Sequence, residues 1–166
     1  KMVSWGKEAQ DMLGRVPDSI EVTRPLRNGV IADYEVAEYI LRDILRKLSG
    51  PLQFFRPQVM ITVPNGITSV ERRAVHEAAL QAGSRDVALI QQPLAAAIGV
   101  DLPIGTPSGN LILCLGGGTT QVAVIAMYGI VTGETLRSGG TSLDESIVGY
   151  IRKKYGLIIG QLTAEQ

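Results

Sequence analysis

A glycine-rich segment in the second half of the chain constrains its fold more than any other feature. It separates an apolar run over 111–115 from another over 122–127, and it consists of Gly116, Gly117, Gly118, Thr119 and Thr120. Two residues are enough to join antiparallel strands, so this turn is longer than a hairpin needs. Consecutive glycines let backbone N–H groups converge without obstruction by Cβ atoms, and threonine hydroxyls add donors. The segment predicts a turn that holds phosphate oxygens, or else a flexible hairpin.

A second pair of glycines predicts another anion-binding position. Gly139 and Gly140 precede a helix expected to end at Tyr155, and Ser142 with Glu145 has the spacing of a capping box. Unpaired N–H groups and the dipole at a helix N-terminus favour negative charge. Two such positions in one part of the chain favour a nucleotide ligand.

The first part of the chain alternates between helix and strand. Asp33 is a suitable N-cap for one helix, and Thr68 with Glu71 forms a capping box for another. We expect a helix over 34–48, a buried strand over 59–63, a helix over 69–82, a buried strand over 87–90 and a short helix over 93–99. This alternation is typical of an α/β fold.

The pattern of the sequence changes near residue 110, from alternating helices and strands to consecutive strands. A connector over 101–110 is rich in Pro, Gly and Ser. It is followed by three apolar strands, over 111–115, 122–127 and 130–136, joined by short turns. We therefore expect a second lobe to begin near residue 110.

Composition excludes several other classes of protein. Apolar residues make up 45% of the 166 residues, but no apolar stretch approaches the ~18 residues that cross a bilayer. The net charge is zero, so the general attraction of a basic domain to nucleic acid is absent and we expect no nucleic-acid partner. One cysteine, Cys114, allows neither an internal disulfide nor a multi-cysteine zinc site, and it is compatible with a reducing cytosol.

Several motifs resemble a known superfamily. The runs I-Q-Q-P-L-A-A-A-I-G over 90–99 and L-G-G-G-T-T-Q-V-A-V over 115–124 resemble the superfamily of actin, Hsp70 and the sugar kinases. The stretches over 24–33, 63–68 and 150–155 are similar to the bacterial actin homologue MreB. The resemblance implies an actin-like, ribonuclease H-like α/β fold of two lobes, with ATP and Mg²⁺ in the cleft between them. It also implies self-association into filaments at the inner, cytoplasmic face of the cell membrane, where partner proteins carry out cell-wall synthesis and morphogenesis.

The resemblance covers only the middle part of the family pattern. Residues 1–28 correspond to part of small subdomain IB, 29–109 to most of subdomain IA, 110–156 to the first part of IIA and 157–166 to the start of IIB. Members of the family also carry an earlier D-x-G-T phosphate loop and a later adenosine-binding motif, which are not in this sequence. We therefore expect the chain to be a fragment with an incomplete pair of lobes, which makes ATP binding by it doubtful.

Four positions that are acidic in the family pattern are neutral in this chain: Gln92, Cys114, Gln121 and Thr141. The acid at position 114 would hold Mg²⁺ through water, and a thiol is a poor substitute for an oxygen ligand. The residue at position 92 would position the attacking water, and actins use a glutamine there. Our hypothesis is a nucleotide site that is degenerate in ATP hydrolysis, with Cys114 a small, buried hydrophobic residue at the end of a strand and not a reactive thiol.

Two adjacent aromatic residues allow two interpretations. Phe54 and Phe55 either pack a connector onto the core or, as in the corresponding loop of MreB, enter the membrane surface. The lone histidine, His76, is expected at the surface, on a helix whose charged face is either solvated or a contact between protofilaments.

Two other functions share these motifs. A nucleotide-gated chaperone of the Hsp70 type and a sugar or carboxylate kinase both use the same fold. The stretch over 24–33 and the pair Phe54–Phe55 favour MreB over either alternative.

Overall fold

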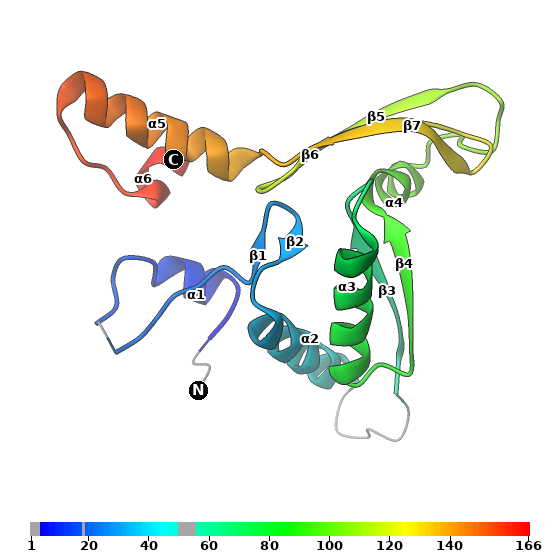
Figure 1. Cartoon of the computed structure of the whole chain (residues 1–166), viewed down its shortest axis with the longest axis horizontal. Helices are drawn as coiled ribbons and strands as arrows, with labels where there is room; N and C mark the ends of the chain where they lie inside the picture. Colours follow the sequence, from blue (N-terminus) through cyan, green and yellow to red (C-terminus); the bar gives the residue numbers. More distant parts are fainter. Residues whose placement is uncertain (1–3, 18, 50–55) are drawn as a thin grey trace.

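The computed structural model describes residues 4–17, 19–49 and 56–166 of the chain, and its elements form two groups (Figure 1). The first group contains helix α2 (Tyr34–Ser49), strand β3 (Gln58–Val63), helix α3 (Ser69–Gln81) and strand β4 (Asp86–Gln91). The second contains strands β5 (Asn110–Leu115), β6 (Thr120–Ala126) and β7 (Gly129–Leu136) and helix α5 (Gly140–Tyr155). Helix α4 (Gln92–Gly99) continues directly from β4 and lies where the groups meet.

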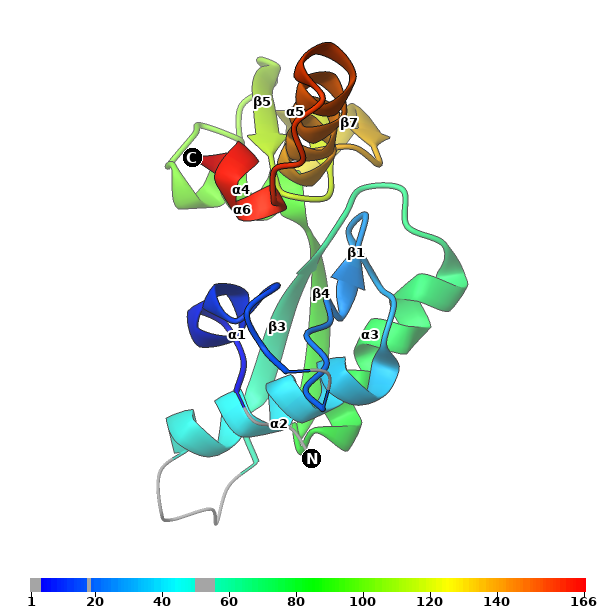
Figure 2. The same cartoon turned by 90° about the vertical axis from the view of Figure 1, so that its left-hand side faces the viewer.

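Strands β3 and β4 pair in parallel, from Gln58 opposite Asp86 to Val63 opposite Gln91. Helix α3 connects them, and α2 packs against α3. Figure 2 shows the second group above the carboxyl ends of the two strands, while α2 lies across their other ends. Ligands of α/β folds commonly bind beyond the carboxyl ends of the strands, so this junction is where a site is expected.

Both side-chain N-caps predicted in this lobe are confirmed. The carboxylate of Asp33 accepts a hydrogen bond of 3.1 Å from the N–H of Val36 at the start of α2. The hydroxyl of Thr68 accepts one of 3.2 Å from the N–H of Glu71, whose carboxylate accepts one of 2.8 Å from the N–H of Thr68. These local bonds satisfy amides that have no partner inside the helix.

The prediction that β3 and β4 are buried strands is wrong for most of their length. Val63 is 2% exposed and Val87 is buried, but Met60 is 68% exposed. Exposure alternates along β3, so the side chains on one face of the sheet are left largely open to solvent.

The second group is an antiparallel meander in the order β5-β6-β7. Its inner face packs on α4, and the apolar core at this contact consists of Ala97, Ile104, Ala123 and Ile125. The outer face is uncovered, with Leu111, Leu113 and Leu115 all more than half exposed. The small Ala97, which is fully buried, lets α4 approach the sheet closely and so fixes the position of Gln92 at its first turn.

Short elements complete the chain at both ends. They are α1 (Lys7–Asp11), the hairpin strands β1 (Leu26–Arg27) and β2 (Val30–Ile31), and α6 (Gln161–Glu165). The hairpin turns at Asn28 and Gly29, both with positive φ, as a tight two-residue turn requires. The indole N–H of Trp5 donates a 2.6 Å hydrogen bond to the carboxylate of Asp43 on α2. None of the helices in the described ranges has the length and apolarity to cross a bilayer.

Candidate functional site

The loop between β5 and β6 contains three consecutive amides that have no hydrogen-bond partner within the described ranges. The N–H of Gly116 donates a 2.9 Å hydrogen bond to the carbonyl oxygen of Thr119 and closes the turn. The N–H groups of Gly117, Gly118 and Thr119 donate no hydrogen bond to the residues that the structure describes. Neighbouring backbone amides of this kind form an anion-binding concavity. The arrangement has the donors that phosphate oxygens would need, and phosphate binding at this loop stays a prediction.

The first lobe supports this loop from one side through the tip of the β1–β2 hairpin. A Cβ atom on Gly118 would lie 3.1 Å from the backbone nitrogen of Asn28. A Cβ atom on Gly29 would lie 2.7 Å from Cγ2 of Thr119 and 2.9 Å from Cγ of Pro64. Glycine is therefore required at position 29, where something would have to shift, while a side chain at position 118 would need the hairpin to move by a few tenths of an ångström. The sequence did not reveal this close packing between the hairpin and the loop.

The start of α5 supports the loop from the other side. The N–H groups of Gly140 and Thr141 donate hydrogen bonds to the carbonyl oxygens of Gly116 (3.0 Å) and Gly117 (2.9 Å). A Cβ atom on Gly139 would lie 2.3 Å from the carbonyl oxygen of Gly116, so only glycine fits there. The expectation of unpaired amides at this helix end does not hold for these two groups, since they already have partners.

The capping box predicted at Ser142 and Glu145 is wrong. Helix α5 begins at Gly140 with Gly139 as its N-cap, and no side chain caps it. Ser142 is already inside the first turn, and its N–H donates to the carbonyl of Gly139 at 3.0 Å. The carbonyls of the glycine loop satisfy the first two amides of the helix, so a side-chain cap is not needed.

Below the loop, a buried glutamine joins the two lobes. Gln121 is fully buried, and its Oε1 accepts a 2.8 Å hydrogen bond from the N–H of Asn65. Its Nε2 donates to Oε1 of Gln92 at 2.6 Å and to the hydroxyl of Thr119 at 3.4 Å. Gln92, the predicted water-positioning residue, is thus connected to the glycine loop through Gln121. All of these side chains are neutral.

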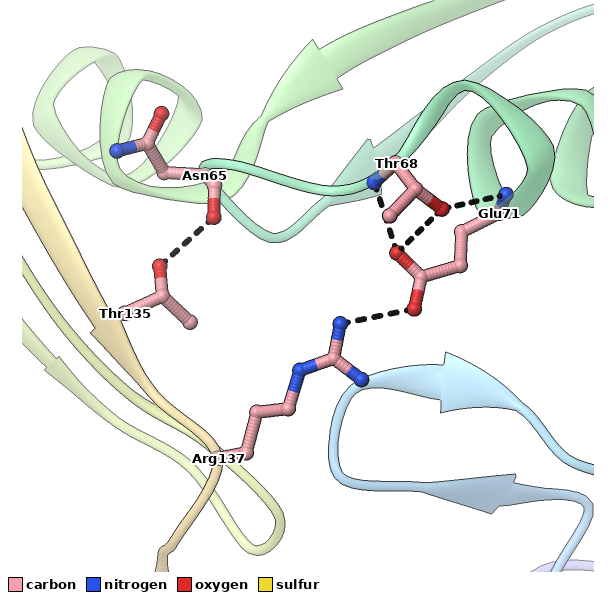
Figure 3. Close-up of polar contacts among 5 residues, drawn as sticks. All are labelled: Asn65, Thr68, Glu71, Thr135 and Arg137. Atoms are coloured by element: carbon pink, nitrogen blue, oxygen red, sulfur yellow. Dashed lines mark hydrogen bonds and ion pairs between the residues drawn. The ribbon is translucent and has the colours of Figure 1, made fainter.

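Two further contacts cross between the lobes beside this site (Figure 3). The hydroxyl of Thr135 on β7 donates a 2.8 Å hydrogen bond to the carbonyl oxygen of Asn65. The guanidinium of Arg137 pairs with the carboxylate of Glu71 at 2.9 Å. Glu71 has its pKa held below the usual range, first by the hydrogen bond from the backbone of Thr68 and then by the hydrogen bond from Arg137.

Arg24 brings a positive charge to the edge of the glycine loop. Its guanidinium donates to the hydroxyl of Thr141 at 3.0 Å and to Oε1 of Gln161 at 3.3 Å. The hydroxyl of Thr141 would lie 3.9 Å from a Cβ atom on Gly117. Sequence reasoning missed Arg24, Asn65 and the hairpin tip, because their roles depend on contacts between segments far apart in the chain.

The residues of the site do not suit a divalent cation. Mg²⁺ prefers carboxylate and water oxygens, and the described ranges contain no group of three or more His, Cys, Asp or Glu side chains that could hold a metal ion. Cys114, opposite Gln121 in the β5–β6 pairing, is half-buried and not fully buried as predicted. This partial burial raises the pKa of its thiol. A protonated thiol next to a buried amide offers no ligand to Mg²⁺.

The remaining residues with a sequence-based prediction are Phe54, Phe55 and His76. Phe54 and Phe55, the candidate membrane contact, lie outside the described residues. His76 on α3, which is expected at the surface from the sequence, is half-buried. On the charged face of the same helix, Arg73 and Glu77 form an exposed ion pair at 2.7 Å.

The fold is that of the actin-like proteins: two α/β lobes that meet at a glycine-rich turn. A solved structure described as a MamK double helical filament superimposes with a TM-score of 0.77 at 25% identity, over 96% of this chain and 49% of that one. A crystal structure of MreB5 of Spiroplasma citri bound to ADP superimposes with a TM-score of 0.90 at 36% identity, over 98% of this chain and 49% of that one.

The chain belongs to the MreB/Mbl protein family, whose sequence pattern matches residues 1–166. The cell shape-determining protein MreB of Haemophilus influenzae is 48% identical over 162 residues, which is 97% of this chain and 46% of that protein. The chain therefore spans about half the length of the relatives that it matches. The resemblance inferred from the motifs is confirmed, and so is the actin-like fold.

Proposed function

We propose that this chain is the phosphate-binding part of an MreB-type cytoskeletal protein that binds ATP, assembles into membrane-associated filaments and organises cell-wall synthesis and rod shape. The observation that carries the proposal is the set of three amides, at Gly117, Gly118 and Thr119, that find no partner in the part of the chain that the structure describes. The ADP-bound MreB5 of Spiroplasma citri and the MamK filament support nucleotide binding and self-assembly in related proteins.

Each part of the site has a distinct proposed role. The loop amides and the hydroxyl of Thr119 donate to phosphate oxygens. The hydroxyl of Thr120 instead supports the loop, since it donates a 2.9 Å hydrogen bond to the carbonyl oxygen of Ser138. Gly139 and Gly140 keep the loop against α5, so they contribute by holding the site and not by direct contact with an anion. Bound ATP would supply the phosphoanhydride bond, and the chain's own residues would bind and orient its phosphates.

We propose further that hydrolysis is degenerate. Phosphoryl transfer depends on a metal ion and on a positioned nucleophile. The site has neutral side chains at Gln92, Cys114, Gln121 and Thr141, so it neither holds Mg²⁺ well nor supplies a base. Arg24 at the edge of the loop offers a positive charge that favours polyphosphate without a metal.

The test is a calorimetric titration of the whole chain with ATP and ADP, in Mg²⁺ and in EDTA, together with a phosphate-release assay. We expect ATP to bind in both conditions with no measurable release of phosphate. In the Gly117→Leu variant the new side chain has room to fill the loop. The affinity for ATP should then fall at least about tenfold, because one or more charge-assisted hydrogen bonds are lost.

Gly149→Leu, at an open position of α5, is the matched control and should bind as the wild type does. Absence of ATP binding by the wild type would overturn the proposed site. Phosphate release that requires Mg²⁺ and disappears in Thr119→Val would show that the site is catalytic and not degenerate.

The wider cellular role has separate tests. We propose a cytoplasmic protein, peripheral at the inner face of the membrane, with the subdomain limits given by the family pattern: 1–28, 29–109, 110–156 and 157–166. Sedimentation with anionic liposomes should decrease in Phe54→Ser with Phe55→Ser, and unchanged sedimentation would argue against membrane contact through this pair. Pelleting on addition of ATP would favour a filament over the chaperone and kinase alternatives.

A further inference from the structure

The hydrogen bonds of Gln121 have a fixed direction. The N–H of Asn65 can only donate, so the end of the Gln121 side chain that faces it at 2.8 Å must be the carbonyl oxygen. The other end of the same amide is then the NH₂ group, which faces Gln92 at 2.6 Å. Gln121 is fully buried, so water does not offer either end another partner.

The same reasoning orients Gln92. Since the NH₂ group of Gln121 donates, Gln92 must present its own carbonyl oxygen to it. The NH₂ group of Gln92 lies on the opposite side of its amide and donates no hydrogen bond to the residues that the structure describes. The chain of hydrogen bonds that runs from Asn65 through Gln121 therefore ends at the NH₂ group of Gln92, which is free to donate.

A single residue, Gln121, links the side chain of Gln92 to the loop that would hold phosphate. Gln92 begins α4, and Gln121 connects it to the hydroxyl of Thr119 in the loop. An N–H donor suits a phosphate oxygen, whereas preparation of a water molecule for attack needs an acceptor near that water.

We propose that Gln121 is a positioning residue that holds the NH₂ group of Gln92 toward the terminal phosphate of a nucleoside triphosphate, so that the site distinguishes triphosphate from diphosphate by donation. The proposal rests on the nucleotide site proposed above and names what that site recognises. It assigns Gln92 to binding and not to activation of water.

The proposal requires an uncharged side chain at position 121. A carboxylate there could accept from Asn65 but could not donate to Gln92, so the amide of Gln92 would turn and present its oxygen to the ligand. A carboxylate at position 92, by contrast, still accepts from Gln121. Two isosteric substitutions should thus have different effects, although both add one negative charge.

The first experiment compares the affinities of the whole chain for ATP and ADP in wild type, Gln121→Glu and Gln91→Glu. Gln91 adds the same charge one residue from Gln92, and its side chain bonds to Asn65 and not to Gln92 or Gln121. We expect the wild type to prefer ATP over ADP. This preference should fall about tenfold in Gln121→Glu, because the variant loses one hydrogen bond to a charged group. The preference should stay within about twofold in Gln91→Glu, where no hydrogen bond of Gln92 changes.

The outcomes separate this inference from the proposed function. If the wild type binds neither nucleotide, the nucleotide site itself is wrong. If it binds both, and the two glutamate variants lose ATP preference equally, charge alone explains the loss and the positioning role of Gln121 is overturned. The same conclusion follows if the wild type binds ATP and ADP equally.

A second experiment tests the direction of the bonds without any nucleotide. Urea midpoints at pH 7 should stay close to that of the wild type in Gln92→Glu, fall in Gln121→Glu and fall further in the double variant, whose two carboxylates face each other. In the double variant the midpoint should rise as the pH is lowered toward 5, because one proton can then be shared. Equal losses in the two single variants would overturn the assigned direction.

Discussion

Arg137 donates a 2.9 Å hydrogen bond to the carboxylate of Glu71, so the residue that completes the capping box of α3 also joins the second lobe to the first (Figure 3). One local signal and one long-range contact thus share a single side chain. The lobes are held at this point by a contact that is partly open to solvent, with the Glu71 side chain 21% and the Arg137 side chain 53% exposed.

Removal of the Glu71 charge should weaken the fold in a pH-dependent way. Because the folded-state pKa of Glu71 is lowered, its contribution to stability is present above the ordinary value of 4.5 and is lost as the pH falls through the folded-state value. Glu71→Gln should lower the free energy of unfolding at pH 7 by about 0.5–1 kcal/mol, a value suited to a partly exposed pair at a helix start.

Urea unfolding of wild type and Glu71→Gln between pH 7 and pH 3 measures this effect. The difference between the two proteins should shrink below pH 4.5. Arg73→Gln, which breaks an exposed pair on the same helix, should leave the midpoint unchanged. A pH-independent difference would show that the charge of Glu71 is not responsible.

Gly139 should tolerate no side chain. In Gly139→Ala the new Cβ atom would meet the carbonyl oxygens of Gly116 (2.3 Å) and Gly117 (2.8 Å), and both are backbone atoms that cannot turn away. We expect a loss of about 2 kcal/mol or more in the free energy of unfolding, as for a strongly overpacked site. Gly149→Ala in the same helix has open space around it and should gain about 0.5–1 kcal/mol. Similar stabilities of the two variants would contradict the close approach of loop and helix.

Alanine substitutions at Gly29 and Gly66 separate the cost of backbone strain from the cost of a steric contact. Both glycines have positive φ, of 79° and 76°, so alanine at either costs about 1 kcal/mol from backbone conformation. Only at Gly29 would the added Cβ atom meet Thr119 and Pro64. Thermal unfolding should therefore show Gly29→Ala to be less stable than Gly66→Ala by a further 1–3 kcal/mol or so. Equal losses would mean that the hairpin tip can move away from the glycine loop.

Cys114 should react slowly with thiol reagents. Burial raises the pKa of its thiol, so the reactive thiolate is scarcer at pH 8 than in a free cysteine. Reaction with a chromogenic disulfide should be at least about tenfold slower than for a cysteine-containing peptide, and denaturant should remove the difference. A rate equal to that of the peptide in the native protein would indicate an exposed thiol and would reopen a chemical role for it.

Two similar sequence motifs show which kind of helix start can be predicted from the sequence. Thr68 with Glu71 and Ser142 with Glu145 have the same capping-box spacing, but only the first forms one. The first is satisfied within four residues. At the second, the carbonyls of Gly116 and Gly117 from a distant loop bond to the helix start, so the N-cap is Gly139, three residues before the predicted Ser142.

The same distinction applies to the candidate site. The glycine-rich turn, its flanking strands and the neutral residues at the family's acidic positions follow from the sequence, because they depend on residue type and short spacing. Residue type and short spacing do not show that Gln121 is fully buried, or that its side chain bonds to Asn65 and Gln92.

The sequence by itself determined the order of strands and helices, the glycine turn between β5 and β6 and membership of the MreB/Mbl family, since hydrophobic period and glycine conformation act locally. Only the tertiary structure decided which amides remain free for a ligand and which way the amide of Gln92 faces. Those properties arise where three segments meet, at Asn65, at Gln92 and in the loop before Gln121, and a buried hydrogen bond takes its direction from a partner far away in the chain.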